Sequence, residues 1–510
     1  MLFNSVDYLI FLPVVVVVYY AVPEKAKHIW LLIASYYFYM CWNAGYALLI
    51  LFSTAITYLS GLLLEKEKLQ ADTDAHGKAI RKKLIVAASF ILNLGMLCYF
   101  KYTGFLLESL QSILALFRIS LHVPKFDILL PVGISFFTFQ ALGYTMDVYR
   151  GEIYAERNFF RYALFVSFFP QLVAGPIERS KNLLKQLAVP QKFSFSRAKE
   201  GLLLMLWGFF LKIVIADRIA LFVDAVYGDV SAYGGWYYLI ATLLFAVQIY
   251  CDFYGYSTIA MGTARILGVQ LMENFDAPYF SCSVAEFWRK WHIALTSWFR
   301  DYLYFPLGGS RKGKLRKYVN QMIVFLVSGL WHGASFTFVI WGAVNGFFQI
   351  IGEITDPIRE KLAGFFHMHR NSAAHRFVSG FITFILIDFS WIFFRASSLN
   401  DAVRVIKGIL SPGSPVSFIQ TVLQKANASV VPGEHGLEAL VLDVALVCIC
   451  IVLLVFADWK KHQGVVLRER IMAQDTWFQS LVIIIAVCCI LLFGIWGPGY
   501  NQSAFIYFQF

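Results

Sequence analysis

Apolar runs follow one another along almost the whole chain, and polar residues gather in the short segments between them. Most runs approach the ~20 residues that an α-helix needs to cross a bilayer. Because lipid cannot hydrogen-bond to exposed backbone groups, such segments must be helical, and the alternation of a membrane β-barrel is absent. The pattern predicts an all-α polytopic membrane protein with roughly 11 to 14 membrane segments, not all of them complete crossings. The runs cover residues 8–22, 29–43, 45–64, 84–100, 104–120, 127–146, 159–176, 200–225, 236–260, 319–350, 377–396, 438–457 and 476–497, besides a charged run at 283–306.

The run at 319–350 does not fit a simple membrane helix. It is too long for one perpendicular crossing and too short for two, at ~20 residues each. Basic stretches at 311–317 and 359–376 flank it, so both of its ends are expected on the same side. A broken or re-entrant hairpin explains this, and Gly329 and Gly333 provide the break. Irregular backbone at membrane depth survives only inside protein or beside a cavity, so we expect such helices around a central tunnel; a single strongly tilted helix is the alternative.

The net charge of +11 comes from Lys and Arg residues that cluster between the apolar runs. The chain is 59% hydrophobic and only 15% charged, whereas soluble domains carry about 25% charged residues. Basic clusters of this kind are typical of cytoplasmic loops in membrane proteins, and they argue against a nucleic-acid partner. Segments 65–83, 311–317 and 460–470 are therefore predicted to lie in the cytoplasm.

Both termini are expected outside, with an even number of full crossings. The first run has no Lys or Arg before it and no convincing small-residue cleavage site, so it is predicted to be a retained helix rather than a signal peptide. The final stretch, 497–510, carries no charge. There is no internal repeat, low-complexity segment or sign of a second domain, so residues 1–510 are interpreted as a single membrane-embedded domain.

The eight cysteines form no disulfide or metal pattern, since most lie inside apolar runs, where Cys behaves as a small hydrophobe. The two cysteine pairs near the C-terminus lack zinc-site spacing. His367, His369 and His375 have no acidic or Cys partner nearby in the sequence. We predict no metal and no bound cofactor.

Two of the ten histidines, His292 and His332, stand in long aromatic, membrane-level segments. An ionisable group at membrane depth is costly and indicates function, and an imidazole exchanges a proton near neutral pH. Beside His332, Gly329, Gly333 and the small residues 334–335 leave room for a substrate. His332 is therefore the candidate catalytic base; the alternative is a histidine satisfied by packing.

Segment 286–301 combines six polar or charged groups with tryptophans. A lipid-exposed helix cannot carry so many, so the segment lies at the interface or lines a wet tunnel. As one continuous helix it would present an apolar face, with Arg289 and His292 as neighbours at i, i+3. The functional interpretation is a polar wall of a substrate channel, which the resemblance described next makes a channel for an acyl donor, and an ordinary interfacial helix is the alternative. The apolar face would comprise Trp288, Trp291, Leu295 and Trp298.

Taken together, these segments resemble the membrane-bound O-acyltransferases, in particular their bacterial alginate O-acetyltransferase branch. The similarity rests on the charged helix that ends in Tyr-Leu-Tyr-Phe-Pro-Leu-Gly-Gly at 302–309 and on Leu-Trp-His-Gly at 330–333, 40 residues beyond His292. It extends over nearly the whole chain, through the motifs at 1–5, 131–140, 147–150, 169–176, 274–279 and 505–510. These motifs are specific for the family and less so for the acceptor.

The resemblance implies histidine-dependent transfer of an acyl group from a cytoplasmic thioester toward the outer face, at the bacterial inner membrane. The family's essential histidine aligns with His332 and its upstream partner with His292. The expected reaction is acetyl transfer from acetyl-CoA to a hydroxyl of an extracytoplasmic, alginate-like polysaccharide, with a secreted or periplasmic SGNH-like partner and with membrane lipids as surroundings. A covalent acyl-histidine intermediate is an open alternative. Candidate substrate contacts are Trp288, Arg289, Lys290, Trp291, Tyr302, Trp331 and Ser335; Arg289, Lys290 and segment 311–317 could attract CoA phosphates.

Other interpretations remain open at this stage. The acceptor could be peptidoglycan, cellulose, teichoic acid receiving D-alanine, or a lipid. Outside the enzymes, a transporter or flippase would suit a dozen helices, although many transporters show an inverted repeat that is not visible here. A structural scaffold is the third alternative.

Overall fold

The structure is a computed structural model that describes residues 1–69, 75–119, 130–173, 175–428 and 437–495. Within these ranges the regular structure is helical and contains no strand. The helices of the N-terminal part are α1 (Val6–Ala21), α2 (Lys27–Met40), α3 (Ala47–Leu69), α4 (Ala75–Leu116), α5 (Ile134–Arg150), α6 (Phe159–Ser167), α7 (Phe169–Leu172) and α8 (Ser180–Ala188). The middle part contains α9 (Phe195–Phe209), the π-helical η3 (Phe210–Ala216), α10 (Asp217–Gly228), α11 (Trp236–Ile266), α12 (Val284–Lys290), α13 (Ile293–Phe299) and the π-helical η6 (Arg300–Tyr304).

The C-terminal part continues with long helices joined by shorter ones. They are α14 (Lys314–His332), α15 (Phe336–Phe365), α16 (Ala373–Arg395), α17 (Leu399–Leu410), α18 (Pro415–Ala428), α19 (Leu437–His462), α20 (Leu467–Met472) and α21 (Thr476–Phe493). Short 3₁₀ turns lie at η1 (Glu24–Ala26), η2 (Ala44–Tyr46), η4 (Val230–Ala232) and η5 (Pro278–Phe280).

Seven of the described helices are long and apolar enough to cross a membrane, and α1 is apolar but shorter. The seven are α3, α4, α11, α15, α16, α19 and α21. This confirms the all-α polytopic class, whereas the central tunnel and the single domain stay predictions. The predicted position of the C-terminus cannot be compared, because residues 497–510 lie outside the described ranges.

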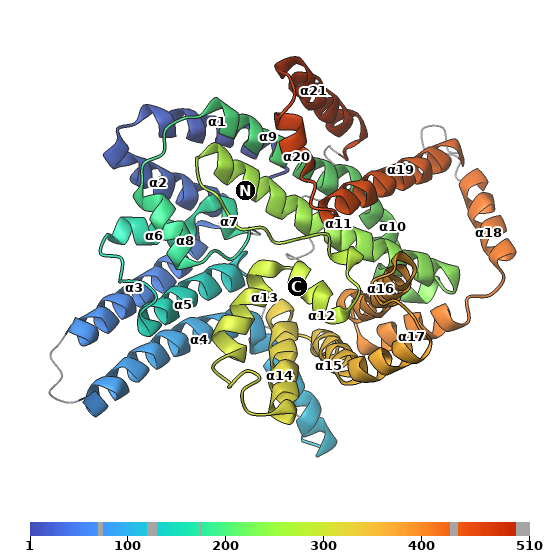
Figure 1. Cartoon of the computed structure of the whole chain (residues 1–510), viewed down its shortest axis with the longest axis horizontal. Coiled ribbons are helices and arrows are strands. Elements are labelled where there is room, and N and C mark those ends of the chain that lie inside the picture. Colours follow the sequence, from blue (N-terminus) through green and yellow to red (C-terminus); the bar gives the residue numbers. More distant parts are fainter. Residues whose placement is uncertain (70–74, 120–129, 174, 429–436, 496–510) are drawn as a thin grey trace.

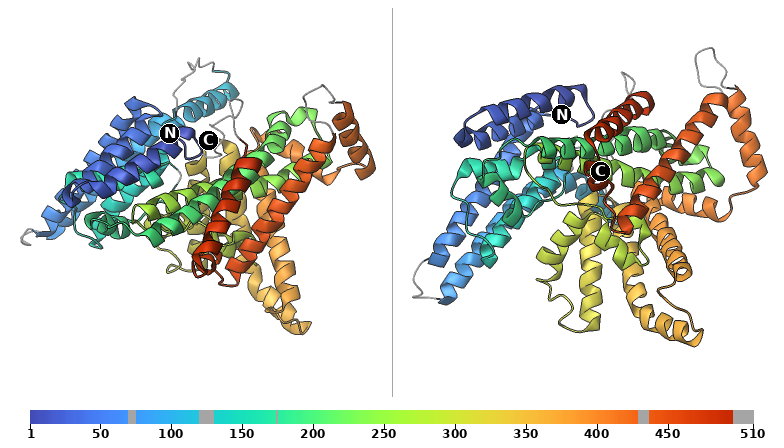
Figure 2. Two further views of the ribbon diagram at one scale, coloured as in Figure 1. Left: turned by 90° about the horizontal axis from the view of Figure 1, so that it is seen from above. Right: turned by 45° about the horizontal axis from the view of Figure 1, so that its top comes forward.

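Helix α11 forms the centre of the molecule, and the other elements are arranged around it (Figure 1). It packs on α9, η3, α10 and α16, and most of its length is buried. The hairpins α3–α4 and α15–α16 extend from this centre as separate arms (Figure 2). Between the arms lie α12, α13 and α14, so the segments that contain both candidate histidines come together near the middle.

Residues 319–350 form part of a helical hairpin, as the length of the run predicted. Helix α14 ends at His332, Gly333 is extended, and Ser335 caps α15 by accepting a hydrogen bond from the Thr337 N–H at 3.3 Å. The break therefore falls after His332. Gly329 was expected to contribute to the break but lies inside α14. Both α14 and α15 extend beyond 319–350 into the basic segments on either side, because Lys, Arg and Glu are good helix formers.

Gly329 of α14 and Gly342 of α15 allow the backbones of these two helices to come into direct contact. A Cβ atom on Gly329 would lie 2.3 Å from the Phe338 carbonyl oxygen, and one on Gly342 would lie 2.3 Å from that of Phe325. Small residues are the usual means of close helix approach in membranes. This contact fixes the position of His332 relative to α15.

Two sequence predictions about helix continuity were wrong. The runs 84–100 and 104–120 were taken as separate segments, but α4 continues through the polar residues between them. Conversely, 286–301 is not one helix: α12 ends at Lys290 and α13 begins at Ile293. Arg289 and His292 are therefore not i, i+3 neighbours on a common helix face.

The interruption at His292 has a clear physical cause in segment 274–276. His292 adopts φ +44°, a left-handed conformation. The Ile293 N–H donates to the Asn274 carbonyl at 2.9 Å, and the Asp276 N–H donates to the Lys290 carbonyl at 3.0 Å. These bonds satisfy backbone groups that a helix would otherwise pair internally.

Candidate active site

His332 ends α14, and its imidazole is enclosed by aromatic rings from three helices. Only 6% of the residue is exposed. Its ring centroid lies 4.9 Å from that of Trp331, 5.0 Å from that of Trp341 on α15 and 5.3 Å from that of Phe394 on α16. All three contacts are edge to face, at separations where aromatic pairs attract each other. The imidazole is thus held by packing from α14, α15 and α16 together.

His292 lies in the break between α12 and α13 and is 1% exposed. Its Nδ1 lies 3.3 Å from Asn274 Oδ1, and its ring meets that of Phe253 edge to face at 4.6 Å. Asn274 Oδ1 also accepts a hydrogen bond from the Ala294 N–H at 3.3 Å. One amide side chain therefore holds both the imidazole and the first turn of α13.

The indole of Trp331 contacts both imidazoles. Its centroid is 4.9 Å from that of His332 and 6.0 Å from that of His292. The two histidines, separated by 40 residues in the sequence, thus belong to one aromatic cluster rather than to opposite faces of the bundle. This placement is compatible with a shared site.

Three tryptophans of the same cluster, on α12, α14 and α15, carry buried indole N–H groups that have no hydrogen-bond partner among the described residues. They are Trp288 of α12, Trp331 of α14 and Trp341 of α15. Trp288 and Trp341 pack edge to face at 5.5 Å. Buried polar groups are nearly always hydrogen-bonded, so several unused donors around one histidine indicate a place where a bound molecule supplies the acceptors. Trp288 and Trp331 were predicted substrate contacts, whereas Trp341 was hidden within a long apolar run.

A small pocket opens beside His332. Lys101, residues 130–136, Trp331 and His332 line it. Lys101 Nζ donates to the Trp331 carbonyl at 2.7 Å and to the His332 carbonyl at 2.9 Å. The sequence did not indicate Lys101, because a lone Lys between two apolar runs has the appearance of a loop residue.

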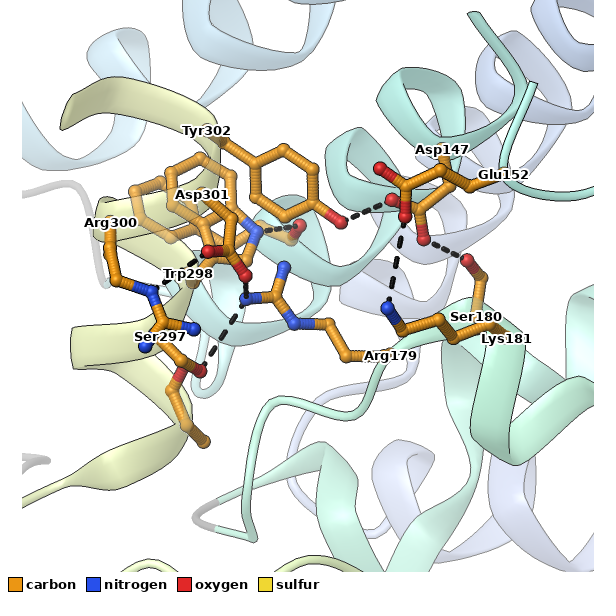
Figure 3. Close-up of polar contacts among 12 residues, drawn as sticks. Asp147, Glu152, Arg179, Ser180, Lys181, Ser297, Trp298, Arg300, Asp301 and Tyr302 are labelled. Atoms are coloured by element: carbon orange, nitrogen blue, oxygen red, sulfur yellow. Dashed lines mark hydrogen bonds and ion pairs between the residues drawn. The ribbon is translucent and has the colours of Figure 1, made fainter. Parts of the chain in front are cut away.

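Tyr302 does not lie in this cluster but in a polar network with Asp147 and Arg179 (Figure 3). Its hydroxyl donates to Asp147, which also accepts a hydrogen bond from Ser180. The guanidinium of Arg179 lies 4.6 Å from the Tyr302 ring centroid and pairs with Asp301 at 2.8 Å. The network therefore ties α5, α8 and η6 together. Trp298 connects it to the cluster, since its N–H donates to the Phe139 carbonyl at 2.9 Å and the Phe139 ring contacts Trp331.

The remaining predicted contacts divide between the cluster and its edge. Trp291 is fully buried and packs on Trp391, which stacks on Trp341. Ser335 is occupied in capping α15. Arg289 is exposed at the end of α12, and Lys290 pairs with Glu286 at 2.8 Å. Neither basic residue belongs to the aromatic cluster.

Comparison with known proteins identifies the fold and chemistry. Residues 155–393 match the model of the MBOAT, membrane-bound O-acyltransferase, family. The chain is 38% identical over 418 residues to the probable alginate O-acetylase AlgI of Pseudomonas aeruginosa, covering 81% of this chain and 76% of that protein. The chain belongs to the membrane-bound O-acyltransferase family. It is also 32% identical over 442 residues to a peptidoglycan O-acetyltransferase of Helicobacter pylori, covering 80% of each protein. A teichoic acid D-alanyltransferase of Bacillus subtilis is 26% identical over 234 residues, 43% of this chain and 58% of that protein.

This membership makes the protein a multi-pass membrane O-acyltransferase and sets aside the transporter and scaffold alternatives. The matched range contains both histidines and the three tryptophans with unused N–H groups. Lys101 lies N-terminal to that range. Membership of the family therefore establishes the type of reaction, O-acyl transfer. The acyl donor, the acceptor and the catalytic residues are the subject of the proposals below.

Proposed function

We propose that this membrane O-acyltransferase transfers an acetyl group from cytoplasmic acetyl-CoA to a hydroxyl of an extracytoplasmic, alginate-like polysaccharide, with His332 as the base. The observation that carries the proposal is the position of His332. It stands at the break of a helical hairpin, surrounded by unused indole N–H donors and beside a pocket. The similarity to alginate O-acetylases over four-fifths of the chain supports the choice of acceptor.

In this mechanism the imidazole of His332 takes the proton of the acceptor hydroxyl as its oxygen attacks the thioester carbonyl carbon. The carbonyl π electrons move to oxygen, and they return when the C–S bond breaks and CoA leaves as a thiolate. The protonated imidazole then returns its proton to the thiolate. General base catalysis of this kind contributes about 10²–10⁴-fold. The indole N–H groups of Trp288, Trp331 and Trp341 would donate to carbonyl and amide oxygens of the acyl donor.

The supporting role proposed for His292 follows from its surroundings. Its Nδ1 faces Asn274, which fixes the orientation of the ring, and its ring contacts the same indole as His332 does. A second fixed imidazole beside Trp331 would help to hold the acyl donor in place. Orientation of reacting groups accounts for a large share of the rate enhancement in many enzymes.

The donor is proposed to enter from a basic face, where several charged segments meet. Arg376 Nη2 lies 2.7 Å from His462 Nε2, which joins the stretch 359–376 to segment 460–470. Lys317 pairs with Glu353, which joins segment 311–317 to α15. The exposed Arg289 lies in the last turn of α12, which ends at Lys290 and is followed by Trp291 and His292. Positive charge here would attract CoA phosphates, and α12 would lead from this face to the aromatic cluster.

Helix α14 separates the two sides of the reaction. From Lys314 to His332 it is about 27 Å long, close to the thickness of the hydrocarbon core. If segment 311–317 lies in the cytoplasm, α14 carries His332 across most of the hydrocarbon core, where an acceptor or an SGNH-like partner can approach from the opposite side. We propose that the protein lies in the bacterial inner membrane with both termini outside.

Complementation in cells tests the acceptor. The gene is expressed in an alginate-producing bacterium that lacks its own O-acetylase, and acetyl groups per uronic acid are measured in the secreted polymer. The proposal predicts that acetylation is restored by the wild-type protein and not by His332→Ala. Acetyl groups that appear on peptidoglycan while the alginate stays unmodified would contradict the proposed acceptor and favour the peptidoglycan alternative, to which a relative of similar coverage points.

A further inference from the structure

Lys101 brings a cationic side chain to the backbone of the His332 turn. It lies in the middle of α4, a 42-residue apolar helix long enough to cross the membrane. Its ammonium donates to the carbonyls of Trp331 and His332 at 2.7 and 2.9 Å. The adjacent Tyr102 hydroxyl donates to the Leu330 carbonyl at 2.5 Å. Two consecutive residues of α4 therefore bind three consecutive carbonyls at the end of α14.

An ammonium at this position needs a physical reason, because a charged group within the membrane is costly. In the described part of the chain, Lys101 forms no ion pair with a carboxylate. The end of α14 supplies a partial compensation, since the last carbonyls of a helix carry the negative end of its dipole. A neutral donor such as a tyrosine could cap these carbonyls without the cost of a full charge, as Tyr102 does one carbonyl earlier. The charge itself therefore calls for a function.

The pocket beside His332 shows where that charge can act. Lys101 and His332 line the same pocket, together with Trp331 and the first turn of α5. An ammonium has three N–H groups, and two of them are used by the carbonyls. The third can reach a molecule in the pocket. The N-terminal end of α5 adds a second source of positive potential on the same space.

We propose that Lys101 is a further catalytic residue of the acyl transfer, whose ammonium hydrogen-bonds the acyl carbonyl oxygen and stabilises the oxyanion of the tetrahedral intermediate. The proposal rests on the proposed function, in which His332 accepts the acceptor proton. As the hydroxyl oxygen bonds to the acyl carbon, the carbonyl electron pair moves to oxygen and meets the Lys101 N–H. When the C–S bond breaks and the thiolate leaves, the pair re-forms the C=O bond. Lys101 remains protonated throughout.

The magnitude follows from known oxyanion sites, where removal of one donor lowers kcat by about 10²–10³-fold. We therefore expect Lys101→Met, which keeps the length of the side chain without charge or donors, to lower kcat by about that factor. The KM for acetyl-CoA should stay within about threefold, because the interaction strengthens mainly as negative charge develops on the oxygen in the transition state. Lys101→Arg keeps the charge and the donors, and it should recover at least about a tenth of the lost activity.

Tyr102→Phe is the matched control. It removes a hydrogen bond from the same turn of α14 but leaves the charge in place, so a role limited to capping would affect both variants alike. We expect Tyr102→Phe to retain more than about a third of wild-type kcat, since the lost hydrogen bond contributes only ~1 kcal/mol to stability and does not contact the reacting atoms. Lys101→Leu, which also lacks charge and donors, serves as the second neutral variant if Lys101→Met is poorly folded.

The experiment measures release of the CoA thiol from acetyl-CoA by each purified full-length variant in proteoliposomes, with polymannuronate as acceptor and His332→Ala beside it. The proposal predicts a loss in both neutral Lys101 variants, partial recovery in Lys101→Arg, and near-normal turnover in Tyr102→Phe. It is overturned if a neutral Lys101 variant keeps more than about a tenth of wild-type kcat, or if Tyr102→Phe loses as much as Lys101→Met. Activity in His332→Ala would instead overturn the proposed function, so the two failures are distinguishable.

Discussion

The close contact between α14 and α15 makes a sharp prediction for Gly329→Ala. The added Cβ would lie 2.3 Å from the Phe338 carbonyl oxygen, whereas ordinary contact begins at 3.4 Å, so the two backbones must separate by about 1 Å. Overpacking of this kind costs about 1–3 kcal/mol. Because His332 lies three residues beyond Gly329 and packs on Trp341 of the opposite helix, the same shift displaces the proposed base. A misplacement of about 1 Å can lower a rate about 10²-fold.

Gly352→Ala provides the matched control for this substitution. Gly352 lies within α15, and a Cβ atom there would meet nothing within 4 Å. Alanine in a helix interior is favoured over glycine by up to about 1 kcal/mol, so this variant should be as stable as wild type or more so. The measurements are the apparent melting temperature of the purified protein and its turnover of acetyl-CoA. Equal stability and equal activity in Gly329→Ala and Gly352→Ala would refute the account of the hairpin.

Two further predictions concern topology and the support of His292. Cysteines placed at Lys68, Lys314 and Ser503 should differ in their reaction with an impermeant maleimide. In intact cells the first two should be protected and the third labelled. Labelling of position 314 from outside would refute the orientation. Asn274→Ala removes the acceptor of the Ala294 N–H and the partner of His292. This variant should lose about 1–3 kcal/mol of stability and turn over more slowly. Asn274→Asp should retain more of the stability and more of the turnover. Unchanged stability and turnover in the alanine variant would remove Asn274 from the site.

Hydrophobic patterning was sufficient to predict the class of the fold and one of its unusual features. Lipid leaves the helix as the only structure for repeated apolar runs, so the all-α class followed directly. The run at 319–350 could be interpreted as a hairpin because the basic segments at both of its ends place them on the same side of the membrane, while the run is too short for two full crossings. The residue at which it breaks was less certain, because glycine serves both for turns and for close packing, and Gly329 serves the second purpose.

Periodicity failed where tertiary contacts decide the backbone. Segment 286–301 has a helical pattern, but the hydrogen bonds from residues 274–276 interrupt it at His292, and nothing in the local sequence encodes those distant partners. The polar residues after position 100 suggested a loop, yet they form the face of α4 that binds α14. Lys101 was missed for this reason. The meeting of His332, Trp341 and Trp288 likewise depends on how three helices pack.

The histidine that ends α14 is the centre of the account, and its replacement is the most direct test. Wild-type protein and His332→Ala are reconstituted at equal amounts, their folding is compared by melting temperature, and the initial rate of CoA thiol release from acetyl-CoA is measured. The account predicts a folded variant whose turnover is lower by about 10²–10⁴-fold or more. A folded variant that retains more than about a tenth of wild-type turnover would contradict the role of His332 as the base.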